Sequence, residues 1–259
     1  GERVVEAVLS GTVTAAPEMA PTPVDEDCHY CGAPVVVAYH QEQVDVYCTE
    51  CDGAYGDSHA TGETGVPEAY GWLGAIPLPP AGLDDRDADG VLTAALTLGQ
   101  TEFVAASEGI CPRCSARTER TIEACESHEA DDGVCPNCDR RRSVVFSSAC
   151  TNCNYATGGG VLQALFADTA FLAFMTDHGL NPVAPASATE FEWFGRGPEE
   201  TYPDRKSGCP VGRYSGTVDE QFVPYRLPSD NGNKTDVRWA SVADDEAGVL
   251  LAGDRPLNV

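Results

Sequence analysis

The sequence predicts an α+β chain in two parts, a cysteine-rich N-terminal region with short helices and a C-terminal region of antiparallel strands. Ten of the 12 cysteines fall in CxxC pairs before residue 154. A Pro- and Ala-rich run at 182–187 marks the boundary, and we take 184–188 as the linker. Beyond it, the turn Asp230–Asn233 precedes β-type residues at Val237–Val242 and Val249–Leu251, which predicts strands.

Composition excludes several classes of protein. The 259 residues carry 16 Lys+Arg and 41 Asp+Glu, a net charge of −25, which is too acidic for a generic binder of phosphate backbones. No apolar run approaches the roughly 18 residues of a membrane span, and no signal peptide opens the chain, so we expect a cytoplasmic protein without a membrane partner. Only Lys206 and Lys234 are lysines; an acidic, lysine-poor surface is what we expect of a halophilic protein.

The first 27 residues are expected to be a helix tail followed by a linker. Residues 1–10 have helical spacing of apolar side chains, and residues 11–27 are rich in Pro, Thr and Ala. The zinc-binding region described next then runs over 28–183.

The first metal site is predicted at Cys28, Cys31, Cys48 and Cys51. Two thiolates three residues apart on a tight turn can both face one tetrahedral Zn²⁺. The segments Ala33–Tyr39 and Val44–Tyr47 between the two pairs predict a hairpin. A knuckle, a hairpin and a second knuckle form a zinc ribbon over 28–51.

A zinc cluster is predicted over 111–153, with two ligand pairings left open. In the nested pairing, an outer site surrounds an inner one: Cys111, Cys114, Cys150 and Cys153 outside, and Cys125, His128, Cys135 and Cys138 inside. In the competing pairing, Cys135 and Cys138 join a neighbouring CxxC pair, and Cys125 and His128 stay free. Four protein ligands close a site to water, so we expect two or three structural zinc ions.

Two helices and one basic cluster complete this region. The acidic run Asp84–Asp89 suits a helix N-terminus, and Leu92, Leu96 and Leu98 continue that helix. A closing helix is expected over 161–178. The basic run Arg140–Arg142 is expected to balance the negative charge of the neighbouring thiolates.

Residues 1–183 resemble the zinc-binding C-terminal region of haloarchaeal ArsR-like winged-helix transcriptional regulators. The resemblance rests on the first ribbon and on four segments: Val4–Thr12, Leu78–Gly82, Gly109–Cys114 and Phe171–Gly179. It implies an archaeal regulatory role, with DNA bound only through a winged-helix domain that these residues do not contain.

Residues 189–259 are similar to the small-chain, C-terminal β-sandwich domain of LacZ-type β-galactosidases, family-2 glycoside hydrolases. The motifs are Glu192–Pro198, Tyr202–Lys206, Val211–Val218 and Asn231–Trp239. The resemblance implies an incomplete antiparallel β-sandwich that stops before the rest of that domain. It implies carbohydrate metabolism with a catalytic large chain as partner, because the family's barrel and its two catalytic Glu are absent here.

Three hypotheses follow. The chain is a β-galactosidase-related small-chain-like segment, not catalytic alone, fused to a structural zinc region. Alternatively, it is the zinc-binding regulatory part of an ArsR-like regulator that lacks its DNA-binding domain. In the third hypothesis, rearrangement or the assembly of fragments has joined two unrelated halves.

Overall fold

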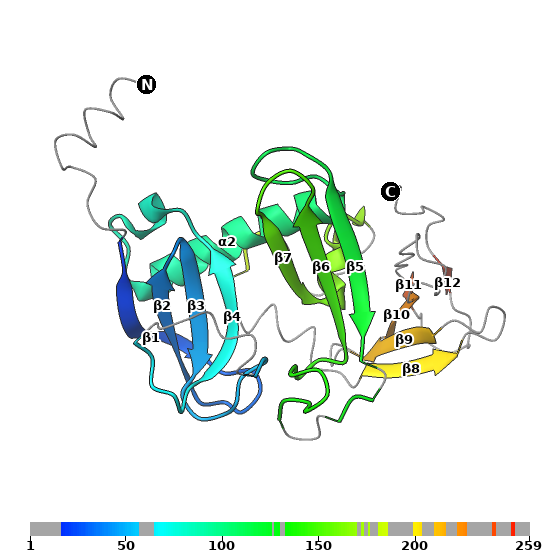
Figure 1. Ribbon diagram of the computed structural model, residues 1–259, viewed down its shortest axis with the longest axis horizontal. Helices are drawn as coiled ribbons and strands as arrows, with labels where there is room; N and C mark the ends of the chain where they lie inside the picture. The colour runs from blue at the N-terminus through cyan, green and yellow to red at the C-terminus, as the bar shows by residue number, and fades with distance from the viewer. Residues whose placement is uncertain are drawn as a thin grey trace.

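In the residues that it describes, the computed structural model consists mostly of antiparallel sheets and a long α-helix (Figure 1). It describes residues 17–56, 65–125, 127–129, 133–169, 172–173, 176 and 181–185, and five short strands between 199 and 251. No helix in these ranges is long and apolar enough to cross a membrane.

The first sheet has the order β1-β2-β3-β4: β1 (Met19–Asp27), β2 (Pro34–His40), β3 (Gln43–Cys48) and β4 (Gly71–Pro77). β2 and β3 form the hairpin expected between the two CxxC pairs, with Val37 opposite Val46. The two turn residues, Gln41 and Glu42, have φ of 49° and 63°. Two left-handed residues give the turn a twist that matches the twist of the strands.

β1 occupies part of the stretch 11–27 that we expected to be a linker. It pairs antiparallel with β2, and Met19 and Val24 pack against the core. Its prolines, Pro21 and Pro23, lack N–H groups, which an edge strand tolerates. The register is irregular on both sides of the Thr22–Pro23 step. The expected helix tail at 1–10 lies outside the described residues.

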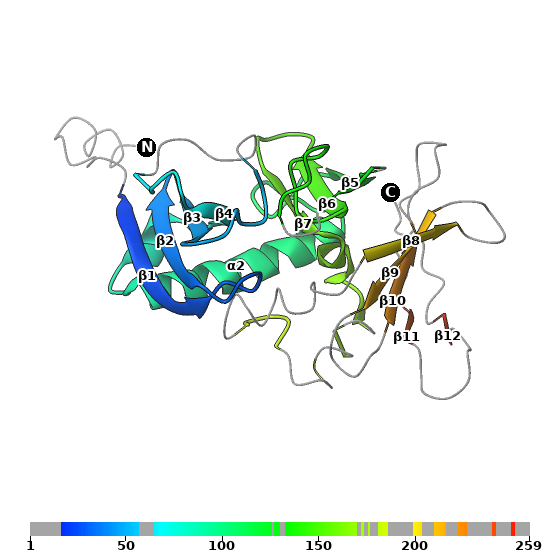
Figure 2. The same ribbon diagram turned by 90° about the horizontal axis from the view of Figure 1, so that it is seen from below.

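Helix α2 (Ala88–Ser107) lies behind the first sheet and extends behind the second sheet, which is described next (Figures 1 and 2). It follows the 3-10 turn η2 (Pro80–Leu83), and the Asp87 side chain caps it by accepting a hydrogen bond from Gly90 N (2.9 Å). Its 20 residues span about 30 Å, which is long enough to serve two sheets. The N-terminal half packs on the first sheet through Val91, Leu92, Ala95 and Leu96.

The second sheet has the order β5-β6-β7: β5 (Thr118–Ala124), β6 (Val144–Cys150) and β7 (Ala156–Gly160). The C-terminal half of α2 contacts the segment 161–166 that follows the second sheet, through the Phe103–Phe166 ring contact and the Ser107 hydroxyl, which donates to Gln163 O (2.7 Å). We expected a closing helix over 161–178; the structure begins this range with the 3-10 helix η3 (Val161–Leu165), and the described residues at 169, 172–173 and 176 are α-helical. Much of the rest of that range lies outside the described residues.

The C-terminal region contains five short strands: β8 (Glu199–Pro203), β9 (Pro210–Ser215), β10 (Phe222–Arg226), β11 (Ala240–Ser241) and β12 (Leu250–Leu251). β8, β9 and β10 form an antiparallel sheet in the order β10-β9-β8, and β11 pairs with β12. The described strands are therefore antiparallel throughout, whereas their arrangement as a sandwich stays a prediction.

Candidate metal centres

Three CxxC turns share one backbone pattern. The N–H of the leading cysteine, Cys28, Cys111 or Cys135, donates to the carbonyl five residues later (2.7, 2.8 and 3.0 Å). The residue four positions on donates its N–H back to that cysteine's carbonyl (2.7, 2.8 and 2.8 Å). That residue is left-handed in each turn: Gly32, Ser115 and Asp139 have φ of 79°, 60° and 55°. This reversal folds each knuckle tightly, as expected of a turn that aims two thiols at one point.

The first cluster consists of Cys28, Cys31, Cys48 and Cys51, whose ligand atoms all lie within 4.8 Å of one another. It lies at the open end of the β2–β3 hairpin. The Cys28–Cys51 and Cys31–Cys48 sulfurs are 3.7 and 3.4 Å apart, and all four cysteines are free. Four sulfurs about 2.3 Å from one zinc ion would be about 3.8 Å apart, whereas a disulfide requires about 2.05 Å. The spacing fits a metal and not a disulfide.

The second cluster consists of Cys111, Cys114, Cys150 and Cys153, again within 4.8 Å. The Cys111–Cys153 and Cys114–Cys150 sulfurs are 3.7 and 3.5 Å apart. The first pair follows α2, and the second begins at the last residue of β6. This cluster therefore lies at the open end of the β5–β6 hairpin, as the first cluster does on β2–β3.

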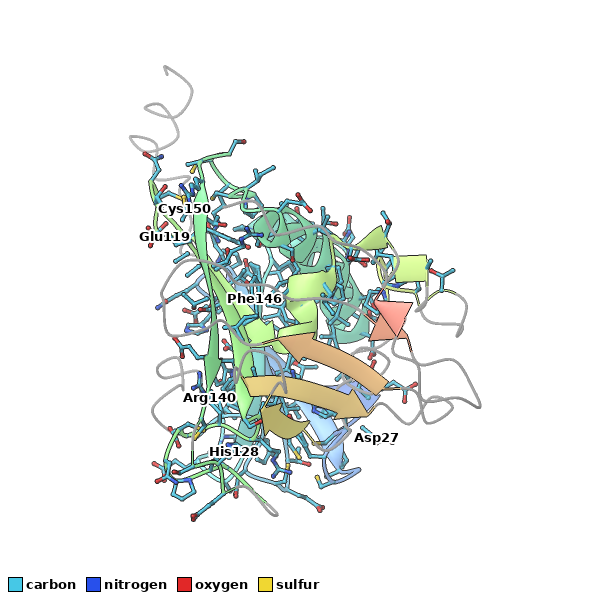
Figure 3. The ribbon with its side chains drawn as sticks, turned by 90° about the vertical axis from the view of Figure 1, so that its right-hand side faces the viewer. Asp27, Glu119, His128, Arg140, Phe146 and Cys150 are labelled. Carbon is cyan, nitrogen blue, oxygen red and sulfur yellow. The ribbon has the colours of Figure 1, made fainter. Side chains whose placement is uncertain are left out.

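The third cluster consists of Cys125, His128, Cys135 and Cys138, in the connection between β5 and β6. It lies at the other end of the hairpin, as the positions of His128 and Cys150 in Figure 3 show. Seven-residue strands separate the two clusters by roughly 20 Å. The structure brings together the nested ligand sets, and it does not bring the third cluster's cysteines to a neighbouring CxxC pair.

His128 presents Nδ1 to the third cluster. Its Nε2 lies 3.2 Å from Arg141 O, and its Nδ1 lies 3.5 Å from Cys138 Sγ. A carbonyl only accepts, so the bond requires the proton on Nε2 and leaves the Nδ1 lone pair for a metal.

Backbone N–H groups favour one thiolate in each cluster. Those of Asn152 and Cys153 lower the pKa of Cys150 to about 6. Burial raises the pKa of Cys135, but the N–H groups of Glu129, Asn137 and Cys138 outweigh it and bring the pKa to about 6. In the first cluster, burial of Cys48 is likewise outweighed by Cys51 N and Glu50 N, which lie 3.3 and 3.4 Å from its sulfur, and its pKa falls. A bound cation deprotonates the remaining thiols.

The basic run beside the third cluster is engaged within the protein. Arg140 Nη1 lies 3.4 Å from Glu123 Oε2, and the Arg141 guanidinium lies 4.3 Å from the centre of the Tyr30 ring. The Arg141–Tyr30 contact was not predicted from the sequence. The sequence feature that points to this contact is Tyr30, an aromatic residue inside the first knuckle. The sequence does not show which cationic side chain packs on it.

All three clusters have four candidate ligands and none contains a carboxylate. Catalytic zinc sites keep one position open for water, whereas sites with four protein ligands are structural. The three clusters could each hold one metal ion, and soft thiolates with one imidazole suit zinc. The remaining cysteine, Cys209, lies outside the described residues.

Comparison with known proteins places the chain in a family. The family model described as beta galactosidase small chain matches residues 117–258. This range includes the third cluster, part of the second cluster and the C-terminal strands, and it runs across the expected linker at 184–188. It covers more than half of the chain, and the chain therefore belongs to the β-galactosidase small chain family.

Curated β-galactosidases match shorter stretches. That of Priestia megaterium is 46% identical over 69 residues, 26% of this chain and 7% of the relative. That of Lactobacillus delbrueckii subsp. bulgaricus is 42% identical over 82 residues (31% and 8%), and that of Vibrio cholerae 48% over 64 residues (25% and 6%). The chain thus spans less than a tenth of each relative. No solved structure matches it significantly.

These matches bear out the resemblance to LacZ-type small chains. They give no support to the resemblance of residues 1–183 to ArsR-like regulators, nor to a halophilic archaeal source, and both stay predictions.

Proposed function

We propose that the chain is a β-galactosidase-related, small-chain-like protein that assists a catalytic large chain and does not hydrolyse galactosides alone. The observation that carries this proposal is the family match over 117–258 together with the identity to several β-galactosidases. In this proposal residues 189–259 form part of a β-sandwich that docks on the large chain.

The catalytic groups belong to the large chain. A retaining glycosidase needs two carboxylates about 5 Å apart, one on each side of the scissile bond. The clusters that the described residues form are made of thiols and one imidazole, which do not perform this chemistry. The role left to the chain is to complete or stabilise its partner.

The zinc region, 28–183, is proposed to be structural, with two zinc ribbons and three ions. Zinc held by each cluster would supply folding free energy to short hairpins, since a structural site is assembled only in the folded chain. The nested ligand sets described above are the proposed ligands.

Complementation tests the function. The full chain is mixed with Priestia megaterium β-galactosidase shortened by the segment that this chain matches, and hydrolysis of o-nitrophenyl β-galactoside is measured. We expect hydrolysis to rise well above that of either protein alone. Trp193→Ala combined with Arg196→Ala, in the Glu192–Pro198 motif, should abolish the rise.

Thr101→Ala, at an exposed position on α2, is the matched control and should leave complementation intact. If the wild-type chain binds the shortened enzyme without restoring hydrolysis, or does not bind it, the small-chain role is wrong.

A further inference from the structure

The first and third clusters are neighbours in space although they are far apart in the sequence, the first ending at Cys51 and the third beginning at Cys125. The segment after Cys51 runs antiparallel to the segment after Cys138. Arg141 N donates to Ala54 O (2.8 Å) and Gly56 N donates to Asp139 O (3.0 Å), with Tyr55 and Arg140 paired between them. A Cβ on Gly56 would lie 1.8 Å from Asp139 Oδ1, so the two segments are in close contact.

Arg141 is fixed by three contacts that belong to different clusters. Its carbonyl accepts from His128 Nε2 of the third cluster (3.2 Å). Its N–H donates to Ala54 O, three residues beyond Cys51 of the first cluster. Its guanidinium lies over the ring of Tyr30, between Cys28 and Cys31, with 4.3 Å to the ring centroid. Arg141 therefore contacts a candidate ligand of the third cluster and residues beside the ligands of the first cluster.

The charges of the two clusters make this position favourable for a cation. Zn²⁺ bound by the four thiolates of the first cluster has a net charge of −2. Zn²⁺ bound by the three thiolates and neutral imidazole of the third cluster has a net charge of −1. Both loaded clusters would therefore be negative. The Arg141 guanidinium lies over the electron-rich face of the Tyr30 ring in the first knuckle, and its backbone carbonyl meets His128 of the third cluster. Arg140 is instead directed to Glu123 on β5.

We propose that Arg141 couples metal retention at the first cluster to metal binding at the third. When His128 ligates through Nδ1, its Nε2–H holds the Arg141 carbonyl, and the loop then keeps the guanidinium over Tyr30. Loss of the third cluster's metal releases this carbonyl, loosens the first knuckle and exposes its thiolates. The inference rests on the proposed structural role of zinc. The second cluster, at the far end of β5–β6, takes no part.

Site-resolved thiol labelling tests the coupling in the full zinc-loaded chain. Zinc content is measured by elemental analysis, and a chelator and N-ethylmaleimide are then added together. Peptide mass spectrometry follows the labelling rate of each cluster. In Arg141→Gln, we expect the first cluster to be labelled at least about fivefold faster than in wild type, the lower end of typical coupling between sites. The second cluster should keep its wild-type rate.

Two further variants separate the contact from the metal. His128→Cys supplies a thiolate ligand in place of Nδ1 but removes the Nε2–H bond, so it should retain zinc and still accelerate labelling of the first cluster. Cys138→Ser removes a ligand of the third cluster and should have the same effect. Arg113→Gln is the matched control, because Arg113 lies in the second cluster's knuckle, 5.6 Å from the Tyr155 ring. It should not alter the first cluster.

The outcomes distinguish the two proposals. If the wild-type chain holds three zinc ions, unchanged labelling of the first cluster in Arg141→Gln, and in Cys138→Ser that has lost the third cluster's zinc, would overturn the coupling and leave structural zinc standing. Equal acceleration at all three clusters in Arg141→Gln would also overturn it, because that pattern indicates general destabilisation. A wild-type chain without zinc would overturn the structural zinc proposal itself.

Discussion

Two units of the chain are built on the same plan and closed differently. Unit one (28–77) and unit two (111–160) each run knuckle, strand, strand, knuckle and third strand. Unit one closes its hairpin with the two residues Gln41 and Glu42, whereas unit two uses the long connection 125–143. That connection carries the third cluster. Unit two thus has a candidate metal site at the position where unit one has a two-residue turn.

The inner faces of the two sheets also differ. Unit one packs Val37, Tyr39 and Val44 on α2, each at most 1% exposed, in a large apolar cluster. Unit two has Phe146 and Ile122 on its sheet, but Thr118 and Ser148 are also buried, at 3% and 1% exposed. Burying hydroxyls contributes less than burying apolar groups of the same size. Unit two therefore has less apolar packing on this face, and we expect its stability to depend more on bound metal than that of unit one.

Removal of metal is expected to produce the largest difference between the two units. With a strong chelator, we expect β5 and β6 to lose their amide protection entirely, while β2 and β3 retain part of theirs through the contact with α2. Binding of structural zinc is worth about 10–16 kcal/mol in zinc-finger peptides, well above the stability of a small apolar core. Hydrogen exchange by mass spectrometry measures both hairpins in one sample.

Added zinc should restore protection in the same sample. Equal loss of amide protection in both units would mean that the apolar core of unit one does not stabilise it without metal. If the chelator leaves the circular dichroism spectrum, the melting temperature and the exchange rates unchanged, the clusters are not structural metal sites.

The core of unit one can be weakened without touching a ligand. Leu92→Ala on α2 removes a side chain that is 2% exposed, and such truncations cost about 2–5 kcal/mol. Exchange should accelerate in β2 and β3 and change much less in β5 and β6. Leu98→Ala, on the same helix at a partly buried position, is the control with the smaller cost. Urea unfolding in zinc-saturated buffer measures both variants, and equal costs would contradict the packing argument.

Features that depend on a few neighbouring residues were predicted from the sequence, whereas features that depend on contacts between distant segments were missed. The β2–β3 hairpin was expected because its strands are rich in Val and lie between two CxxC pairs, and both features act over a few residues. The strand β1 was missed because Pro21 and Pro23 indicate a linker, and only pairing with β2 makes the segment a strand. The Tyr30–Arg141 contact depends on how the two units dock, which neither local sequence specifies.

The candidate site shows the same division. CxxC spacing marks the thiols, but spacing alone leaves two pairings open in 111–153, the nested one and the one that joins Cys135 and Cys138 to a neighbouring CxxC pair. The sheet register resolves the geometry: β5 and β6 pair in full, with Thr118 opposite Cys150 and Ala124 opposite Val144. This pairing places the outer cysteines at one end and the inner set at the other. The C-terminal motif was found from sequence because it is long, whereas its sheet arrangement depends on contacts between distant segments.

The smallest expected effect tests whether the knuckles of the two units are equivalent. Gly32 and Ser115 occupy the same left-handed position, with φ of 79° and 60°, and nothing lies within 4 Å of a Cβ built on Gly32. Gly32→Ser should therefore cost about 1 kcal/mol through backbone conformation alone. Ser115→Gly should gain less than that, since glycine also raises the entropy of the unfolded chain. Urea unfolding with zinc present measures both. A cost of several kcal/mol for Gly32→Ser would show that the first knuckle tolerates no side chain, and the two turns would then be alike in backbone but not in surroundings.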